Sequence, residues 1–252
     1  MPVVYVLAGW AWNDLFFSFF VILSVYFLVE FHNKAAESRN FANVIFAGIS
    51  MGLAACTKYT FILYLPGISI LILIGIFRWK WPVKTIILFL IPVALLSSLW
   101  MIKNWAFTGN PVYPFLNEIF QSPEWTANAD RYLKATLNRS EIGDWSWSTY
   151  LLFPFILTLK PQIIDVHTGV LPLMFAFLII RKSRSETERI LKWWLVLSIL
   201  CWFIFQTIIR SLIPVLAIVF CLGALALQEL NWESPLLRRI TSLLIAIAVT
   251  MD

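Results

Sequence analysis

The feature that most limits the possible folds of this chain is the apolar run from Phe41 to Phe77. As a single helix, its 37 residues would be about 55 Å long, whereas the hydrocarbon core of a membrane is about 30 Å thick. Thr57-Lys58-Tyr59-Thr60 interrupts the run, and a lysine at mid-bilayer would cost about 2.5–3.5 kcal/mol. We therefore predict two membrane-spanning helices with Lys58 in the turn between them.

A second apolar run, residues 193–230, has Arg210 near its middle. The same argument predicts a second helical hairpin with Arg210 at its tip. The composition excludes an ordinary soluble domain, because 60% of the 252 residues are hydrophobic and 13% are charged, against about a quarter charged in soluble domains. The net charge of +5 comes from short basic clusters between apolar runs, which is typical of membrane orientation, so we predict no nucleic-acid partner.

We predict an all-α fold, a polytopic transmembrane helical bundle that forms a single domain over residues 1–252. Gly109-Asn110-Pro111 should end one spanning helix, because these residues favour turns. A long outer-face segment, 103–165, begins there. Residues 145–160 have too few apolar side chains to span and fit an interfacial helix. The chain starts and ends within apolar runs, so we expect a piece of a longer protein.

The distribution of basic residues predicts the orientation. Lys and Arg are concentrated in the short loops 31–40, 78–84, 181–192 and 231–239, which the positive-inside rule places in the cytoplasm. Asp14, Lys58 and Arg210 then share the outer face with the long polar segment, provided that residues 147–160 do not span. We expect an integral, multi-pass protein of a prokaryotic inner or plasma membrane, in contact with membrane lipids.

Isolated cations on such a face suit the phosphate of a lipid-linked substrate, because Lys and Arg supply both charge and hydrogen-bond donors. We predict these substrate-binding residues: Lys58, Arg210, Lys103, Asn104, Asn110, Tyr113, Asp165 and His167. Each has a simpler alternative. Lys58 and Arg210 could anchor helix ends by snorkelling, and Asp14 could cap its helix. Asp165 and His167 could be ordinary loop residues.

Several phrases resemble the GT-C glycosyltransferases, membrane enzymes that use polyprenyl-phosphate sugars and include protein mannosyltransferases and bacterial lipopolysaccharide sugar transferases. KNWAFTGNPVYPF (103–115) resembles their basic-Asn…Gly-Asn-Pro-x-Tyr/Phe-Pro phrase. GLAACTKYTFILYLP (52–66) is similar to their Gly-rich helix, Lys-Tyr tip and returning helix. IIRSLIPVLAIV (208–219) resembles their late Arg-Tyr-Leu-x-Pro segment, with Ser211 in place of Tyr, and AWNDLFFSFF (11–20) their acidic tip.

The resemblance implies transfer of a sugar from a polyprenyl-phosphate-linked donor to a lipid or glycan acceptor. Asp14 would be the second acidic position, catalytic and in some members a ligand of a divalent metal ion. Lys58 and Arg210 would hold the donor phosphate. The family's catalytic acid, which activates the acceptor hydroxyl, lies in the first outer loop and has no counterpart here. An N-terminally truncated, inactive portion of the enzyme is therefore expected.

Two other kinds of protein stay open. A transporter or flippase of lipid-linked intermediates would carry charged residues near the bilayer midplane and internal repeats. The sequence shows no clear repeat, and its charges lie at predicted helix ends, so the transferase interpretation is favoured. A non-catalytic membrane protein is the third alternative.

Overall fold

The computed structural model describes residues 13–123, 125–137, 146–159, 171–205 and 208–228. Within these ranges the regular structure is helical and no strand occurs, as the all-α prediction requires. The chain divides into two compact units. The N-terminal unit comprises Phe16–Arg139 and Ile204–Gln206, and the C-terminal unit comprises Met1–Leu15, Ser140–Phe203 and Thr207–Asp252.

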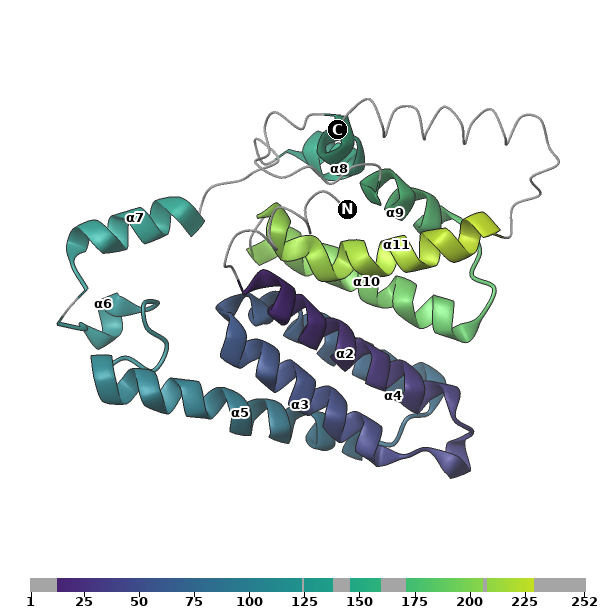
Figure 1. The fold of residues 1–252 in the computed structure, drawn as a ribbon, viewed down its shortest axis with the longest axis horizontal. Helices are drawn as coiled ribbons and strands as arrows, with labels where there is room; N and C mark the ends of the chain where they lie inside the picture. The colour runs from purple at the N-terminus through teal and green to yellow at the C-terminus, as the bar shows by residue number, and fades with distance from the viewer. Residues whose placement is uncertain (1–12, 124, 138–145, 160–170, 206–207, 229–252) are drawn as a thin grey trace. The chain divides into compact units, whose positions relative to one another are not determined.

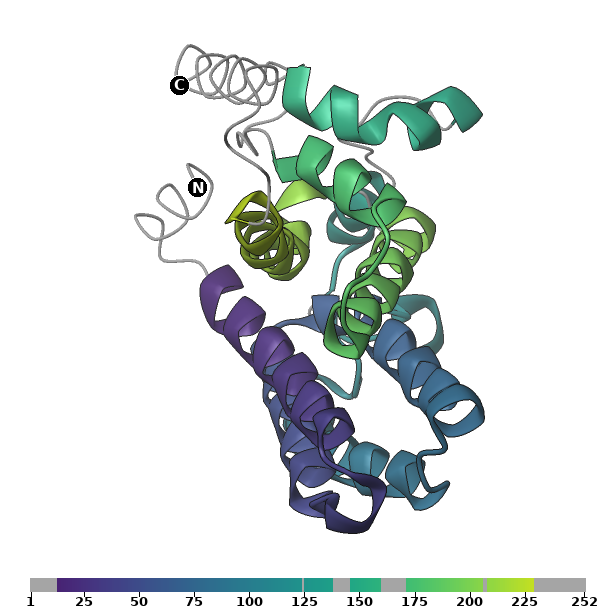
Figure 2. The ribbon, with the colours of Figure 1, turned by 90° about the vertical axis from the view of Figure 1, so that its right-hand side faces the viewer.

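The N-terminal unit is built from four long helices and a smaller polar segment (Figures 1 and 2). Its elements are α2 (Asp14–Asn33), η1 (Ala36–Ser38), α3 (Phe41–Thr57), η2 (Tyr59–Leu63), α4 (Leu65–Trp79), α5 (Lys84–Thr108), α6 (Asn117–Phe120) and α7 (Ala127–Leu137). Aromatic pairs join α2 to its neighbours. Phe27 contacts Phe46 of α3, and Phe17 contacts Tyr64 next to α4.

Two glycines allow α3 to approach α5 closely. A Cβ atom on Gly48 would lie 2.3 Å from the carbonyl oxygen of Phe89, and one on Gly52 would lie 2.9 Å from the Cβ atom of Leu96. Both distances are too short for real atoms, so only glycine fits at these positions. Small residues four apart are a known means of bringing membrane helices together. The spacing of Gly48 and Gly52 therefore accounts for the packing of α3 on α5.

The C-terminal unit contains α8 (Trp147–Leu159), α9 (Leu171–Ile180), α10 (Glu186–Phe205), η4 (Ile209–Leu212) and α11 (Ile213–Gln228). Helix α9 packs against both α8 and α11. Phe153 of α8 is buried and contacts the rings of Phe175, Trp202 and Phe203. These aromatic contacts form the core of the unit.

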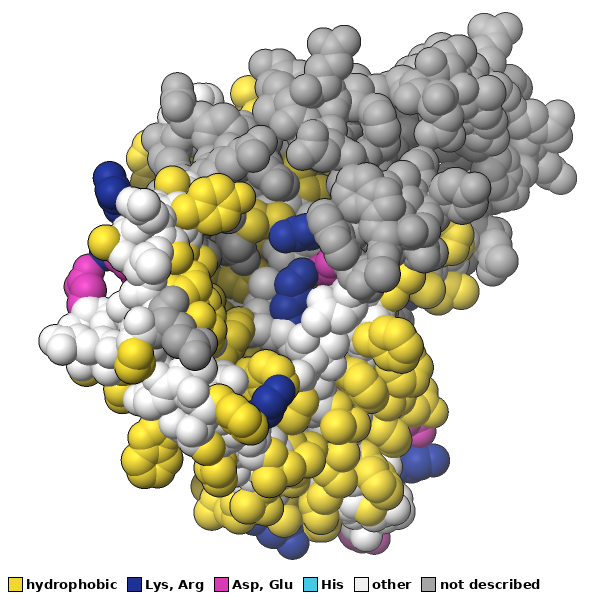
Figure 3. Space-filling view, turned by 60° about the vertical axis from the view of Figure 1, so that its left-hand side comes forward, with side chains coloured by type: hydrophobic (Ala, Val, Ile, Leu, Met, Phe, Trp, Pro, Cys, Tyr) yellow, Lys and Arg dark blue, Asp and Glu magenta, His cyan; other side chains and the backbone are white. Residues whose placement is uncertain are grey.

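Four helical stretches are long and apolar enough to cross a membrane: Asp14–Asn33, Tyr59–Trp79, Lys84–Thr108 and Ile209–Ala226. Many of their large apolar side chains are exposed, as on a lipid-facing surface. In Figure 3 hydrophobic side chains cover much of the lower part of the molecule, while charged side chains lie at its lower edge. Helix α8 has 13 residues and is shorter than the roughly 17 needed to span, as predicted for residues 145–160.

Both predicted helix breaks are confirmed. Helix α3 ends at Thr57 and η2 begins at Tyr59, so Lys58 lies between them. Arg210 lies in η4, between α10 and α11. Helix α5 keeps Lys103 and Asn104 and continues to Thr108, directly before the predicted helix end at Gly109-Asn110-Pro111. Polar residues do not end a helix by themselves, and a residue with left-handed backbone does. The predicted spans at 2–12 and 240–250 lie outside the described residues.

Candidate functional site

Gly109 ends α5 and opens the predicted outer loop. Its φ is +71°, in the left-handed region, and its N–H donates to the carbonyl of Trp105 at 2.9 Å. Glycine adopts this conformation without the clash that a side chain would bring. The predicted helix end at Gly109-Asn110-Pro111 is therefore confirmed.

Asn110 holds the following loop closed. It is fully buried, its Oδ1 accepts from the backbone N–H of Val112 at 3.0 Å, and its Nδ2 donates to the carbonyl of Phe115 at 2.8 Å. The side chain thus bridges both ends of the Pro-Val-Tyr-Pro sequence. Its polar atoms are engaged within the loop, so the structure gives Asn110 a role in folding the loop.

A single tyrosine oxygen connects this loop to the turn after α3. The Tyr59 hydroxyl donates to the carbonyl of Tyr113 at 2.5 Å, and it accepts from Asn104 Nδ2 at 2.7 Å and from Trp100 Nε1 at 3.3 Å. The Tyr59 ring also meets that of Phe115 edge to face, with 5.0 Å between centroids. We call Tyr59, Trp100, Asn104 and Tyr113 the Tyr59 cluster. Together they join η2, the end of α5 and the outer loop.

Two predicted phosphate-binding cations adjoin the Tyr59 cluster in sequence. Lys58 precedes Tyr59; it is half-buried with extended backbone, and its N–H caps α3 by donating to Ala54. Lys103 precedes Asn104, is exposed, and has its Nζ 4.3 Å from the centroid of the Trp100 ring, a cation–π contact. The hydrogen bonds of the Tyr59 cluster fix the backbone next to both lysines. The two lysines therefore extend from backbone segments that are hydrogen-bonded to each other.

The polar segment beyond the loop is attached through Trp125 and through ion pairs. The Trp125 ring meets the Tyr113 ring edge to face at 5.4 Å, and its Nε1 donates to Asp130 at 3.4 Å. Lys134 of α7 pairs with Asp130 at 2.8 Å and with Glu118 of α6. The hydrogen bond from Lys134 lowers the pKa of Asp130. The hydrogen bonds to Asp130 and Glu118 raise the pKa of Lys134. Lys134 and Glu118 are exposed and Asp130 is half-buried, so these ion pairs add little stability.

The remaining predicted site residues are not members of the Tyr59 cluster. Asp14 is the first residue of α2 and is buried, where the helix dipole favours a negative charge. Arg210 is half-buried in the C-terminal unit, whereas the Tyr59 cluster belongs to the N-terminal unit. Asp165 and His167 lie outside the described residues.

The metal role predicted for Asp14 stays a prediction. In the described part of the chain, no group of three or more His, Cys, Asp or Glu side chains is placed to hold a metal ion. One carboxylate is too few for a Ca²⁺ or Zn²⁺ site made of protein ligands, whereas Mg²⁺ can be held by one or two carboxylates together with substrate phosphates. We therefore derive no chemical step through a metal ion.

Tyr59 and Trp100 were not among the predicted site residues. Their importance lies in contacts that span 41 to 54 residues of sequence, which periodicity cannot reveal. One local signal was present, since Tyr59 directly follows the lysine of the interrupting Thr-Lys-Tyr-Thr. A polar aromatic residue beside an isolated cation at a predicted helix end indicates a hydrogen-bonding position.

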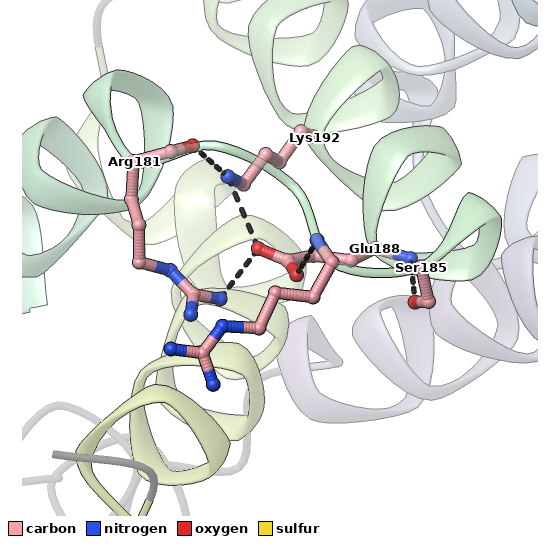
Figure 4. Close-up of polar contacts among 5 residues, drawn as sticks. Arg181, Ser185, Glu188 and Lys192 are labelled. Atoms are coloured by element: carbon pink, nitrogen blue, oxygen red, sulfur yellow. Dashed lines mark hydrogen bonds and ion pairs between the residues drawn. The ribbon is translucent and has the colours of Figure 1, made fainter.

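A second polar cluster lies in the C-terminal unit, where α9 turns into α10 (Figure 4). Glu188 is buried and pairs with Arg181 Nη2 at 2.6 Å and with Lys192 Nζ at 3.0 Å. It also accepts from the backbone N–H of Arg184 at 2.9 Å, and its own N–H donates to Ser185 at 3.0 Å. Burial opposes ionisation, but these partners outweigh it and lower the pKa of Glu188. The geometry is that of a helix cap joined to a buried ion pair.

Comparison with protein families gives one result. Residues 13–149 match the family described as Domain of unknown function (DUF8201), which is more than half of the chain. The chain belongs to this family. The matched region contains the whole Tyr59 cluster, Asp14 and both lysines, and it ends before Arg210. No curated protein and no solved structure matches the chain.

Proposed function

We propose that this chain belongs to a multi-pass membrane glycosyltransferase of the GT-C type, in a prokaryotic inner or plasma membrane. It moves a sugar from a polyprenyl-phosphate-linked donor to a lipid or glycan acceptor on the outer face. The single observation that supports this most is the Tyr59 cluster. It brings the Lys-Tyr tip and the Lys-Asn…Gly-Asn-Pro-Val-Tyr-Pro phrase, two separate parts of the resemblance, into direct hydrogen-bonding contact.

In this proposal Lys58 and Lys103 bind the donor phosphate. As the acceptor hydroxyl attacks the anomeric carbon, the bond between that carbon and the phosphate oxygen breaks. The departing polyprenyl phosphate gains negative charge, which fixed cations stabilise more in the transition state than in the ground state. A base takes the hydroxyl proton; Asp14 is the acidic residue that the resemblance places near the catalytic centre. Asn104 and Tyr59 hold the backbone beside the two lysines.

The test is a transfer assay on membranes containing the full-length protein, with a panel of radiolabelled polyprenyl-phosphate sugars. Loss of a charged hydrogen bond costs about 1.5–3 kcal/mol, so Lys58→Ala and Lys103→Ala should each lower kcat/KM for the donor by about 10–100-fold. Lys34→Ala is the matched control, because Lys34 is an exposed lysine in the loop between α2 and α3. It should leave transfer unchanged.

The proposal is wrong if wild-type membranes transfer no sugar from any donor, or if both lysine variants behave as wild type. Substitution of Arg210 provides a second part of the test. Arg210→Ala should also lower kcat/KM for the donor. Normal transfer by this variant would remove Arg210 from the donor site without affecting the assignment of the two lysines. Movement of the intact labelled lipid across the membrane without sugar transfer would instead show a flippase.

A further inference from the structure

The turn between α4 and α5, Arg78–Lys84, lies at the end of the N-terminal unit away from the Tyr59 cluster along α5. The helical stretches on either side, Tyr59–Trp79 and Lys84–Thr108, are both long and apolar enough to cross a membrane. A turn between two spanning helices lies at the membrane surface, because unpaired backbone groups are not tolerated in the hydrocarbon. The turn is therefore at headgroup level.

The side chains of this turn are of two kinds. Val83 in the turn and Phe77 directly before it are 66% and 84% exposed, which suits the boundary between headgroups and acyl chains. Arg78, Lys80 and Lys84 are also exposed, and residues 78–84 include no Asp or Glu. A basic cluster next to apolar anchors is complementary to a surface of anionic lipids.

The basic side chains in and near the turn differ in whether they already contact other residues. The Arg39 guanidinium donates to the carbonyls of Lys80 and Trp79, at 3.3 and 3.5 Å. The Lys84 Nζ lies 3.7 Å from the centroid of the Phe41 ring. For the side chains of Arg78 and Lys80, the described part of the chain shows no hydrogen bond or ion pair. These two cations are therefore available to an external anion.

The backbone presents Lys80 in an unusual way. Its φ is +53°, and the Trp81 N–H donates to the carbonyl of Gly75 at 3.0 Å, so Lys80 occupies a helix-ending position where glycine is usual. The buried Trp81 ring lies against Gly75, where a Cβ atom would come within 2.4 Å, and its Nε1 donates to His32 at 3.3 Å. The contacts of Trp81 with Gly75 and His32 thus hold the turn in place. Within the turn, a lysine occupies a position whose backbone conformation favours glycine.

We propose that the Arg78–Lys84 turn is a binding site for anionic phospholipid headgroups, with Arg78 and Lys80 contacting the phosphate. The unusual lysine makes a clean test possible. In Lys80→Gly the charge disappears while the left-handed backbone becomes easier to form. Reduced lipid binding by this variant could then not be attributed to a disrupted turn.

The experiment is native mass spectrometry of the full chain in detergent, titrated with phosphatidylglycerol or with phosphatidylcholine. Wild type should retain phosphatidylglycerol preferentially. Each basic residue near an anionic surface contributes about 1 kcal/mol, so Lys80→Gly and Arg78→Gln should each weaken phosphatidylglycerol binding about fivefold. Lys80→Gly should keep or raise the thermal unfolding temperature. Lys182→Gln, an exposed lysine of the other unit, is the control for non-specific charge effects.

Three results would overturn the proposal. The first is equal binding of the two lipids by wild type. The second is an equal loss of phosphatidylglycerol binding in Lys182→Gln and Lys80→Gly. The third is displacement of the lipid by millimolar inorganic phosphate, which would show a site for free anions. Sugar transfer is not measured, so this test stands apart from that of the proposed function.

Discussion

Tyr59 is the residue on which the candidate site depends most directly, and Tyr59→Phe removes only its oxygen. The change leaves the side chains of Asn104 and Trp100 and the carbonyl of Tyr113 without their partner. A polar group that loses its partner costs about 1–3 kcal/mol. We expect a lower thermal unfolding temperature in detergent and reduced sugar transfer.

The control for this substitution is Tyr26→Phe, which removes the hydroxyl of an exposed tyrosine on α2. It should change neither quantity. An unfolding temperature for Tyr59→Phe equal to that of Tyr26→Phe would mean that the three hydrogen bonds contribute nothing in the folded protein.

Glu188 gives a prediction about pH. Its partners lower its pKa below the ordinary value of 4.5. Its contribution to stability is therefore complete above pH 4.5 and is lost as the pH falls through the folded-state pKa. Glu188→Gln leaves two partly or fully buried cations without a counter-charge, so we expect a loss of about 3 kcal/mol at neutral pH. Unfolding temperatures measured from pH 7 to pH 3 should converge for the variant and wild type.

Glu186→Gln is the matched control for Glu188→Gln. Glu186 pairs with Arg189 at 2.5 Å, but both side chains are exposed, so the expected loss is below about 1 kcal/mol. Similar losses for the two variants would contradict the importance of burial at Glu188.

At the scale of elements, the contact between α3 and α5 places the strictest limit on side-chain size. Gly48→Leu would place side-chain atoms where the backbone of Phe89 already lies, so the two helices must separate. Overpacking of this kind costs about 1–3 kcal/mol, and occasionally more. We expect a clear fall in unfolding temperature. Ala94→Leu, at an exposed position of α5, should have little effect, and equal effects would show that the helices tolerate separation.

The sequence allowed the helix breaks to be predicted, because their causes are local. A run too long for one span and a single cation within it were enough to place turns at Lys58 and Arg210. Gly109 likewise marked the end of α5. The sequence did not reveal how α5 accommodates Lys103: this cation lies over the Trp100 ring, one turn earlier in the helix. That contact depends on three-dimensional geometry.

The candidate site was predictable only in part. The loop and the two lysines of the site could be predicted, because turn-forming residues and charges are recognised from residues that are adjacent in the sequence. The Tyr59 hydroxyl that joins the loop to the turn after α3 could not be predicted, because Tyr59 and Asn104 are 45 residues apart in the sequence. The sequence also did not reveal that Asn110 is buried and closes the loop with two hydrogen bonds. Its contact with substrate stays a prediction.

At the scale of the whole molecule, the order of helices predicts the sides of the membrane. Helix α3 leads away from the loop containing Glu37, α4 returns to Pro82, and α5 crosses to the segment containing Glu118. Single cysteines at positions 37 and 82 should therefore react with a membrane-impermeant thiol reagent from one side, and a cysteine at position 118 from the other. The native cysteines are first replaced by alanine.

The orientation itself is a separate outcome of this labelling. The positive-inside rule predicts that position 118 is labelled in intact cells and that positions 37 and 82 require permeabilisation. Labelling of all three positions in intact cells would be incompatible with a membrane-spanning α5.

The length of α5 also predicts the depth of the Tyr59 cluster in a membrane. Its 25 residues extend about 37 Å, some 7 Å more than the hydrocarbon core. If an upright α5 starts at one boundary with Lys84, it reaches the opposite boundary near Asn104. The Tyr59 oxygen then lies level with the phosphate groups of the surrounding lipids, and the closed loop at Asn110 lies above them. In the proposed transferase, a lipid-linked sugar would meet the lysines with its phosphate still in the headgroup layer and its sugar already in water.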